Sequence, residues 1–153
     1  MSNAIENRLA ELGLTLPDAP APAANYVPFV KTGNQVYVSG QLPTGPDGLI
    51  KGKLGDDLDA DAGAEAAKYC ALALLSQARK AADGDLSRVR VLKLVGFVNS
   101  TADFGDQPKV VNGASDLMVE VMGENGRHAR SAVSAASLPF GVAVEVEGIF
   151  EIV

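Results

Sequence analysis

Residues 128–147 read His-Ala-Arg-Ser-Ala-Val-Ser-Ala-Ala-Ser-Leu-Pro-Phe-Gly-Val-Ala-Val-Glu-Val-Glu. This pattern predicts two short strands that form a hairpin around the Leu-Pro-Phe-Gly turn. Arg130 stands near the start of the first strand and Glu145 in the second, and both charges are conspicuous among alanine, serine and valine. We therefore expect a compact α+β domain whose small-molecule site is centred on these two residues.

The length and composition indicate one globular domain. The chain has 153 residues, of which 47% are hydrophobic, and its net charge is −6. An acidic balance disfavours nucleic acid as a partner, because such binding draws on basic residues that neutralise phosphates. No apolar run approaches the ~20 residues that cross a bilayer, and the start of the chain lacks the pattern of a secretory signal. We expect a cytoplasmic protein without a membrane partner.

Cysteine and histidine are too scarce for several kinds of site. Cys70 is the single cysteine, so an internal disulfide and a multi-cysteine metal site are excluded. It lies in an alanine- and leucine-rich helical pattern, where a buried, inert thiol is expected. His128 is the single histidine, so one chain cannot assemble a zinc site or a two-histidine ribonuclease mechanism. No glycine-rich phosphate loop is present either, and we expect no metal.

The first 24 residues form a separate segment before a domain spanning residues 25–153. Residues 3–12 carry apolar side chains at helical spacing, with Asn3 as the cap and Gly13 as the end. Residues 14–24 contain three prolines and predict an extended connector. The opening helix is expected to be an appendage that lies on the domain.

The remaining pattern predicts the order β-β-α-β-α-β-β. The expected elements are a hairpin at 26–30 and 35–42, a loop at 43–57, a helix at 60–82, a strand at 88–99, a helix at 104–121, and strands at the start of the quoted stretch and at 142–152. The first long helix should bury the residues Ala67, Cys70, Ala71, Leu74, Leu75 and Ala78, and the second Val111, Leu117, Met118 and Val121. Val89, Val91, Val95 and Phe97 are expected on one side of their strand.

Two helices on one face of a mixed sheet is the simplest packing of these elements. The other face then stays uncovered, and we expect it to include Val144, Val146 and Phe150. Self-association through that face would remove these apolar side chains from water.

Arg130 is the most informative single residue. An arginine among small residues either forms a structural ion pair or binds an anionic ligand, and composition alone leaves both readings open. Its guanidinium is a planar fork that fits a carboxylate with two parallel hydrogen bonds. The small neighbours Ser131 and Ala132 leave room for such a ligand.

His128 and the glutamates have two readings each. His128 is either a general base or a loop histidine that precedes a strand. Glu145, Glu147 and Glu151 share one strand face by parity, as solvated carboxylates. If that face becomes a subunit interface, a glutamate near Arg130 would instead hold or deprotonate a water molecule.

Several segments together resemble the RidA/YjgF family of reactive-intermediate deaminases, also labelled endoribonuclease L-PSP. They are Tyr26-Val27, Val38-Ser39-Gly40-Gln41-Leu42-Pro43, Val111-Asn112, Ala129-Arg130-Ser131 and Leu138-Pro139 through Val144-Glu145-Val146-Glu147. The resemblance covers roughly residues 25–153. The opening helix and the long loop at 43–57 are more similar to a longer subgroup than to RidA itself.

The resemblance implies a chorismate-mutase-like fold that forms a homotrimer with clefts between subunits. It further implies a cofactor-independent hydrolysis of 2-imino acids, or their enamine tautomers, to 2-keto acids and ammonia. By position, Arg130 would bind the substrate carboxylate and Glu145 would orient or activate water. Tyr26 and Asn112 would line the cleft from opposite sides of the interface, and the backbone at Ser39 and Gly40 would contact the imine end.

Two positions depart from the family pattern, and at one of them His128 stands where the residue before Ala-Arg-Ser is often proline. Ala132 stands in the expected substrate site where RidA-type sequences carry a cysteine. A non-catalytic binder of a small carboxylate metabolite is therefore a second hypothesis. RNA cleavage or translation inhibition, which the older label suggests, is a third and is disfavoured by the acidic balance.

Overall fold

The fold is organised around β5 (Val89–Asn99), which pairs with a strand on each side. We describe it from a computed structural model, which describes residues 4–22 and 24–153. The other elements are α1 (Ala4–Glu11), β1 (Phe29–Thr32), β2 (Gln35–Gln41), β3 (Thr44–Gly45), β4 (Gly48–Leu49), α2 (Ala60–Ala81), η1 (Leu86–Arg88), α3 (Gln107–Met122), η2 (Gly123–Gly126), β6 (Ala129–Ala135), η3 (Pro139–Gly141) and β7 (Val144–Ile152). The expected α+β class is confirmed.

The main sheet has five strands in the order β1-β2-β7-β5-β6. β6 runs parallel to β5, whereas β7 is antiparallel to both β5 and β2. The predicted hairpin of β6 and β7 is therefore wrong, because β5 lies between them. The reason is the crossover through α3, which returns the chain parallel to β5 and leaves β6 at the sheet edge. Residues 136–143, with the predicted turn, then lead past the end of β5.

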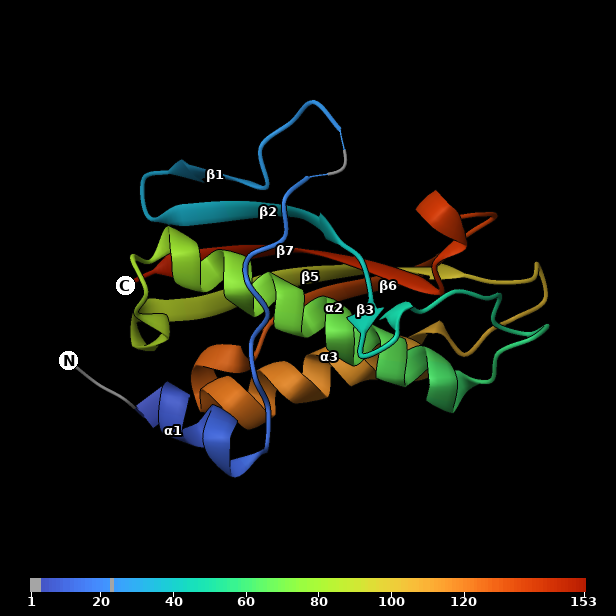
Figure 1. Cartoon of the computed structure of the whole chain (residues 1–153), viewed down its shortest axis with the longest axis horizontal. Coiled ribbons are helices and arrows are strands. Elements are labelled where there is room, and N and C mark those ends of the chain that lie inside the picture. The colour runs from blue at the N-terminus through green and yellow to red at the C-terminus, as the bar shows by residue number, and fades with distance from the viewer. Residues whose placement is uncertain (1–3, 23) are drawn as a thin grey trace.

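Helices α2 and α3 lie side by side along one face of the sheet (Figure 1). The Asp59 side chain accepts a hydrogen bond from the Ala62 amide and caps α2. All ten residues predicted as the apolar stripes of these two helices are buried, so that prediction is confirmed. Burial raises the pKa of the Cys70 thiol far above its ordinary value, which agrees with an inert thiol.

Two predictions about sheet faces are wrong. Val144, Val146 and Phe150 are fully buried under the helices rather than exposed on the free face. Strand β5 also bulges between Val91 and Lys93, which changes the alternation of its side chains. Val95 and Phe97 therefore lie opposite to the face that Val89 and Val91 present.

The second face of the sheet is not covered by any described helix. It presents Glu145 and Glu147 of β7 together with exposed apolar side chains, of which Tyr37 is 45% and Val133 47% accessible. An uncovered face was expected, although with other residues on it.

No described helix is long and apolar enough to cross a membrane.

The N-terminal segment packs on the helical layer. Leu9 of α1 is buried, and Arg8 Nε donates to the carbonyl of Glu120 in α3 over 2.9 Å. The connector then crosses α2 on its way to β1 (Figure 1), where Ser76 Oγ donates to the Pro17 carbonyl over 2.7 Å. Helix α1 thus lies on the domain as expected. The predicted Asn3 cap lies outside the described residues, and the domain boundary at residue 24 stays a prediction.

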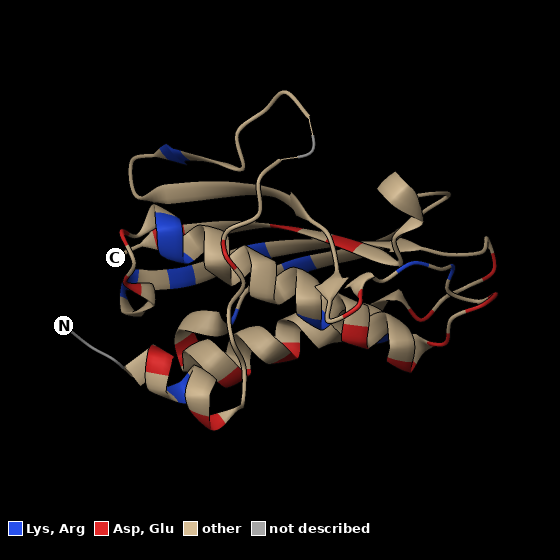
Figure 2. Cartoon of the chain, in the orientation of Figure 1, with Lys and Arg blue, Asp and Glu red and all other residues tan. Residues whose placement is uncertain are grey.

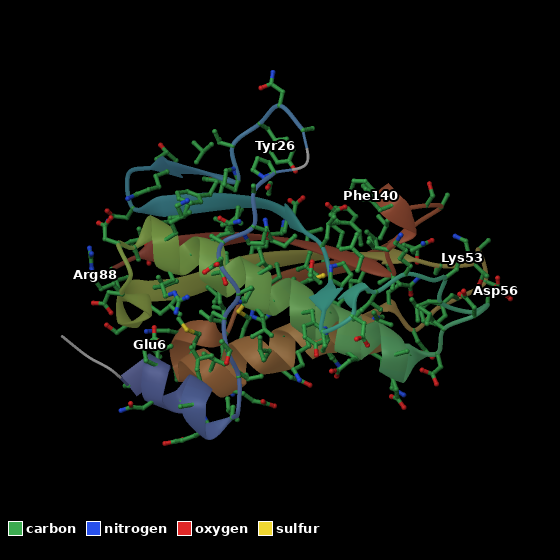
Figure 3. All side chains as sticks on the ribbon, viewed as in Figure 1. Glu6, Tyr26, Lys53, Asp56, Arg88 and Phe140 are labelled. Atoms are coloured by element: carbon green, nitrogen blue, oxygen red, sulfur yellow. The ribbon has the colours of Figure 1, made fainter. Side chains whose placement is uncertain are left out.

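The segment 43–57 is more ordered than the loop that its composition predicts. β3 and β4 form a small hairpin within it. Beyond them, Lys53 Nζ donates to Asn99 Oδ1 and to the Ala136 carbonyl, each over 2.7 Å. This ammonium fastens the segment to the ends of β5 and β6 (Figure 3).

Candidate functional site

Arg130 lies on the edge strand β6 and points toward α3. Its Nη1 donates to Asn112 Oδ1 over 2.8 Å and to Ser115 Oγ over 3.2 Å, and its Nη2 donates to the Pro108 carbonyl over 3.4 Å. Since Asn112 and Ser115 are three residues apart in the helix, they occupy one face and meet the same guanidinium. Two of the predicted site residues, Asn112 and Arg130, are thus in direct contact.

No carboxylate pairs with Arg130 among residues 4–22 and 24–153. All of its recorded partners are neutral, so its charge is not compensated locally. Nor is a hydrogen bond recorded from its Nε to these residues. The Nε–Nη2 edge of a guanidinium is the edge that grips a carboxylate with two parallel bonds. Of the two readings of Arg130, this geometry favours the anionic ligand over the structural ion pair.

His128 contacts this arrangement through Ser115. Its Nδ1 lies 2.6 Å from the Gly126 carbonyl, and its Nε2 lies 2.8 Å from Ser115 Oγ. A carbonyl can only accept, so Nδ1 carries a proton. In the neutral tautomer with that proton, Nε2 accepts a hydrogen bond from the Ser115 hydroxyl. Ser115 thus joins His128 to Arg130. Sequence reasoning missed Ser115, although its spacing from Asn112 was a usable signal.

Glu145 lies on the opposite side of the molecule from this cluster, over the backbone of Gly40. A Cβ atom at residue 40 would collide with the Glu145 carboxylate. The ladder between β2 and β7 is irregular between Val38 and Gln41, which places Ser39 and Gly40 in a bulge. Partial burial, and then the nearby Glu147 carboxylate, raise the pKa of Glu145. A carboxyl with a raised pKa is better suited to exchange protons with a bound water than one with an ordinary pKa.

A cavity of about 170 Å³ opens beside Gly40 and brings together three predicted residues. Tyr26, Ser39 and Gly40 line it, and Pro20 to Pro22 of the connector form another wall. Figure 3 shows Tyr26 in the loop that precedes β1. The Ser39 hydroxyl and amide both donate to the Pro28 carbonyl, over 3.1 and 3.0 Å. Three of the predicted site residues, Tyr26, Ser39 and Gly40, thus line one cavity.

Arg130 and Glu145 do not meet within one chain. Arg130 pairs with Leu94 and Glu145 with Phe97, and these β5 residues are three apart, so they face opposite sides of the sheet. Within one chain the two residues therefore lie apart, and a site that they share between subunits stays a prediction. Strands β7 and β5 also lie between β2, which carries Gly40, and β6, which carries Arg130. Three strand spacings of about 4.8 Å place β2 and β6 about 14 Å apart.

Ala132 is on β6, two residues beyond Arg130 and on the same face. It is partly buried and packs against the core. The structure therefore contains two half-sites. The arginine half-site consists of Arg130, Asn112, Ser115 and His128 beside Ala132. The glutamate half-site consists of Glu145, Gly40, Ser39 and Tyr26.

The charged side chains of the described residues form no basic stripe. Lys and Arg are scattered over several elements rather than gathered in one stripe (Figure 2). Within the described part of the chain, no three His, Cys, Asp or Glu side chains are grouped so that they could hold a metal ion.

Known proteins resemble this chain over nearly its whole length. A sequence model of the family described as "YjgF/chorismate mutase-like, putative endoribonuclease" matches residues 6–150. Protein TCP17 of Trypanosoma cruzi is 51% identical over 154 residues, which cover 99% of this chain and 96% of TCP17.

Solved structures show the same fold. The crystal structure of Atu1372 from Agrobacterium tumefaciens, a protein of unknown function, has a TM-score of 0.92 and 50% identity, covering 99% of this chain and 94% of its own. RidA from Psychrobacter sp. PAMC 21119 has a TM-score of 0.60 and 30% identity, covering 88% of this chain and 94% of its own. The expected resemblance is confirmed: the chain belongs to the YjgF/RidA family.

Proposed function

We propose that this protein hydrolyses reactive 2-imino acids, or their enamine tautomers, to 2-keto acids and ammonia, at a cleft between two subunits of a homotrimer. The observation that carries the proposal is the Arg130 guanidinium, which neutral groups hold in place. On its carboxylate-binding edge, Nε donates to no described residue and Nη2 makes only a 3.4 Å bond to the Pro108 carbonyl. The substrate is a small acid, and the reaction needs no cofactor.

The chemistry suits a small set of residues. Arg130 binds the substrate carboxylate, and Glu145 accepts a proton from a water molecule as its oxygen attacks the imine carbon. The imine nitrogen is protonated when water attacks, so the product is a neutral carbinolamine. Its nitrogen takes up the proton from Glu145, the C–N bond breaks as the hydroxyl oxygen forms the C=O bond, and the hydroxyl proton passes to the departing ammonia. One protonated imine and one water are consumed, and one keto acid and one ammonium ion are formed. A protonated imine is already electrophilic, so positioning supplies much of the acceleration.

The separation of the half-sites supports an intersubunit cleft. One copy would contribute Arg130 and Asn112 from its sheet edge, and its neighbour would contribute Glu145, Tyr26 and the Ser39–Gly40 backbone. Contact between two different surfaces is heterologous, and it closes into a ring when the rotation between copies permits. The exposed Tyr37 and Val133 on the uncovered face would be covered by this association.

The test is turnover combined with subunit mixing. Imines generated in situ from amino acids should be hydrolysed faster in the presence of the protein, and Arg130→Ala and Glu145→Gln should each abolish this acceleration. Subunits of these two variants, unfolded and refolded together at equal amounts, should regain activity. Random mixing in a ring gives about a quarter of the clefts both functional residues. No acceleration for any imine would refute the deaminase, and no recovery on mixing would refute the shared cleft.

A non-catalytic carboxylate binder is the second candidate, favoured by Ala132 in place of the family cysteine. It requires the same carboxylate-binding edge of Arg130 but no proton transfer. Calorimetric titration with 2-keto acids distinguishes it, since binding that depends on Arg130 but not on Glu145, without turnover, would identify a binder.

A further inference from the structure

We propose that residues 20–22 of the connector form the wall of the site against which the substrate side chain packs, and that this wall selects 2-imino acids with short, uncharged side chains. The inference rests on the proposed function and names its substrate class. It begins from the cavity beside Gly40, in which Pro20, Ala21 and Pro22 face the Ser39–Gly40 bulge.

The lining of this cavity carries no carboxylate, ammonium, guanidinium or imidazole. Leu42 and Leu49 add apolar surface to that of the prolines. A charged substrate side chain placed here would lose its hydration without gaining a partner. The volume of about 170 Å³ is below the ~300 Å³ at which pockets for drug-sized ligands begin. Both properties favour a compact, neutral side chain.

The wall is fixed by helix α2. Gln77 Nε2 donates to the Pro20 carbonyl over 2.8 Å, and Ser76 Oγ holds the Pro17 carbonyl over 2.7 Å. Proline restricts the backbone at both anchors and at residue 22. Because two helix side chains hold the connector at two points, the size of the cavity is set before a ligand arrives.

The same glutamine connects the wall to the bulge. Gln77 Nε2 lies 3.5 Å from Gln41 Oε1, and Gln41 Nε2 donates to the Ser39 carbonyl over 3.0 Å. Gln77 is fully buried, and its Oε1 accepts no hydrogen bond from the described residues. A buried side-chain amide with an unsatisfied oxygen is unusual. We attribute the presence of Gln77 at this position to its contacts, which link the Pro20 carbonyl to Gln41 and so to Ser39. Gln77 is therefore a positioning residue for both sides of the cavity.

The experiment compares imines derived from alanine, 2-aminobutyrate, leucine and glutamate in the wild-type protein and in Ala21→Leu. Ala21 is exposed at the cavity, so the larger side chain narrows it without disturbing the core. We expect kcat/KM for the leucine-derived imine to fall about tenfold or more in the variant, and that for the alanine-derived imine to change less than about twofold. The glutamate-derived imine should be a poor substrate of the wild-type protein. Ala24→Leu is the matched control, since Ala24 is exposed on the same connector but does not line the cavity.

The outcomes separate this inference from the proposed function. The proposed wall is refuted if Ala21→Leu turns over imines with an unchanged side-chain preference, or if the wild-type protein uses the glutamate-derived imine efficiently. Either result is still consistent with the deaminase activity. If no imine is hydrolysed by the wild-type protein, the deaminase fails. Calorimetry with the corresponding 2-keto acids then tests the wall. Weaker binding of the leucine-derived keto acid to Ala21→Leu, with unchanged binding of the alanine-derived one, would support it, and an unchanged preference would overturn it.

Discussion

The carboxylate of Glu145 lies over the backbone of Gly40, in the space that a Cβ atom at residue 40 would occupy. This relationship explains why the strand needs a glycine there: it permits a half-buried carboxylate to rest on a neighbouring strand. The bulge, the glycine and the glutamate are thus one arrangement, and each can be tested separately.

Replacing Gly40 with alanine should displace the Glu145 carboxylate. We expect kcat for imine hydrolysis to fall by about 10²-fold, because a misplaced catalytic group costs that much. Gly105→Ala is the control, since a Cβ at residue 105 meets nothing within 4 Å. Equal activity of the two variants would show that the position of Glu145 over residue 40 does not matter for turnover.

Glu145→Gln should abolish turnover and yet stabilise the protein at neutral pH. The folded-state pKa of Glu145 is raised above its ordinary 4.5. The protonated side chain therefore contributes fully to stability at pH values below 4.5, and this contribution is lost as the pH rises through the raised pKa. The neutral glutamine avoids this loss. We expect a higher Tm for the variant at pH 7–8, by no more than about 4 °C because solvent screens the half-exposed carboxylate.

The gain in Tm should disappear below about pH 4, where both side chains are neutral. Thermal scans of the wild-type protein and the variant across this range measure the effect, with Glu147→Gln as a comparison on the same strand. A destabilised variant at pH 8 would contradict the raised pKa.

Arg130→Lys should lose most of the affinity for a short 2-keto acid. A lysine is a point charge and cannot provide the planar fork, so we expect a Kd at least about tenfold weaker by calorimetry. Arg127→Lys is the matched control, because Arg127 is nearby but pairs with Glu124. Equal losses in the two variants would indicate a general effect of positive charge rather than a specific clamp.

Ser115 and His128 should act on ligand binding through Arg130. Ser115→Ala and His128→Ala should each weaken 2-keto acid binding by several-fold, since both remove the support at Nη1. If the three residues form one chain of hydrogen bonds, the double variant should be no weaker than Ser115→Ala alone. Additive losses in Kd would show that His128 acts independently of Ser115.

Local patterns in the sequence predicted the helices and most strands, and the limits of such prediction are clear in particular residues. The spacing of Cys70, Leu74 and Ala78 was sufficient to identify the buried side of α2, because helical periodicity is a local property. The parity of β7 correctly placed Glu145 and Glu147 together. It could not say which face the helices cover, and so Val146 was assigned to the wrong one.

Strand pairing and the site depend on long-range contacts. Nothing local in residues 128–147 reveals that β5 lies between the two strands, since that follows from the crossover through α3. Asn112 and Arg130 were linked through the family resemblance, whereas Ser115 was missed. The contribution of Pro20 to the cavity was also missed, because a proline-rich composition predicts an extended chain but not the surface on which it lies.

The position of β7 has a consequence for biosynthesis. It is the last strand in chain order, yet it lies between β2 and β5. Before residues 144–152 leave the ribosome, the β1–β2 hairpin and the β5–α3–β6 unit share no strand pairing. Val36 of β2 and Leu94 of β5 then both lack β7, the strand with which each of them pairs. The sheet therefore stays incomplete until residues 144–152 are available. A variant without them would lose the strand that pairs with both β2 and β5 while α2 still contacts both parts, and we expect it to aggregate rather than to be mildly destabilised.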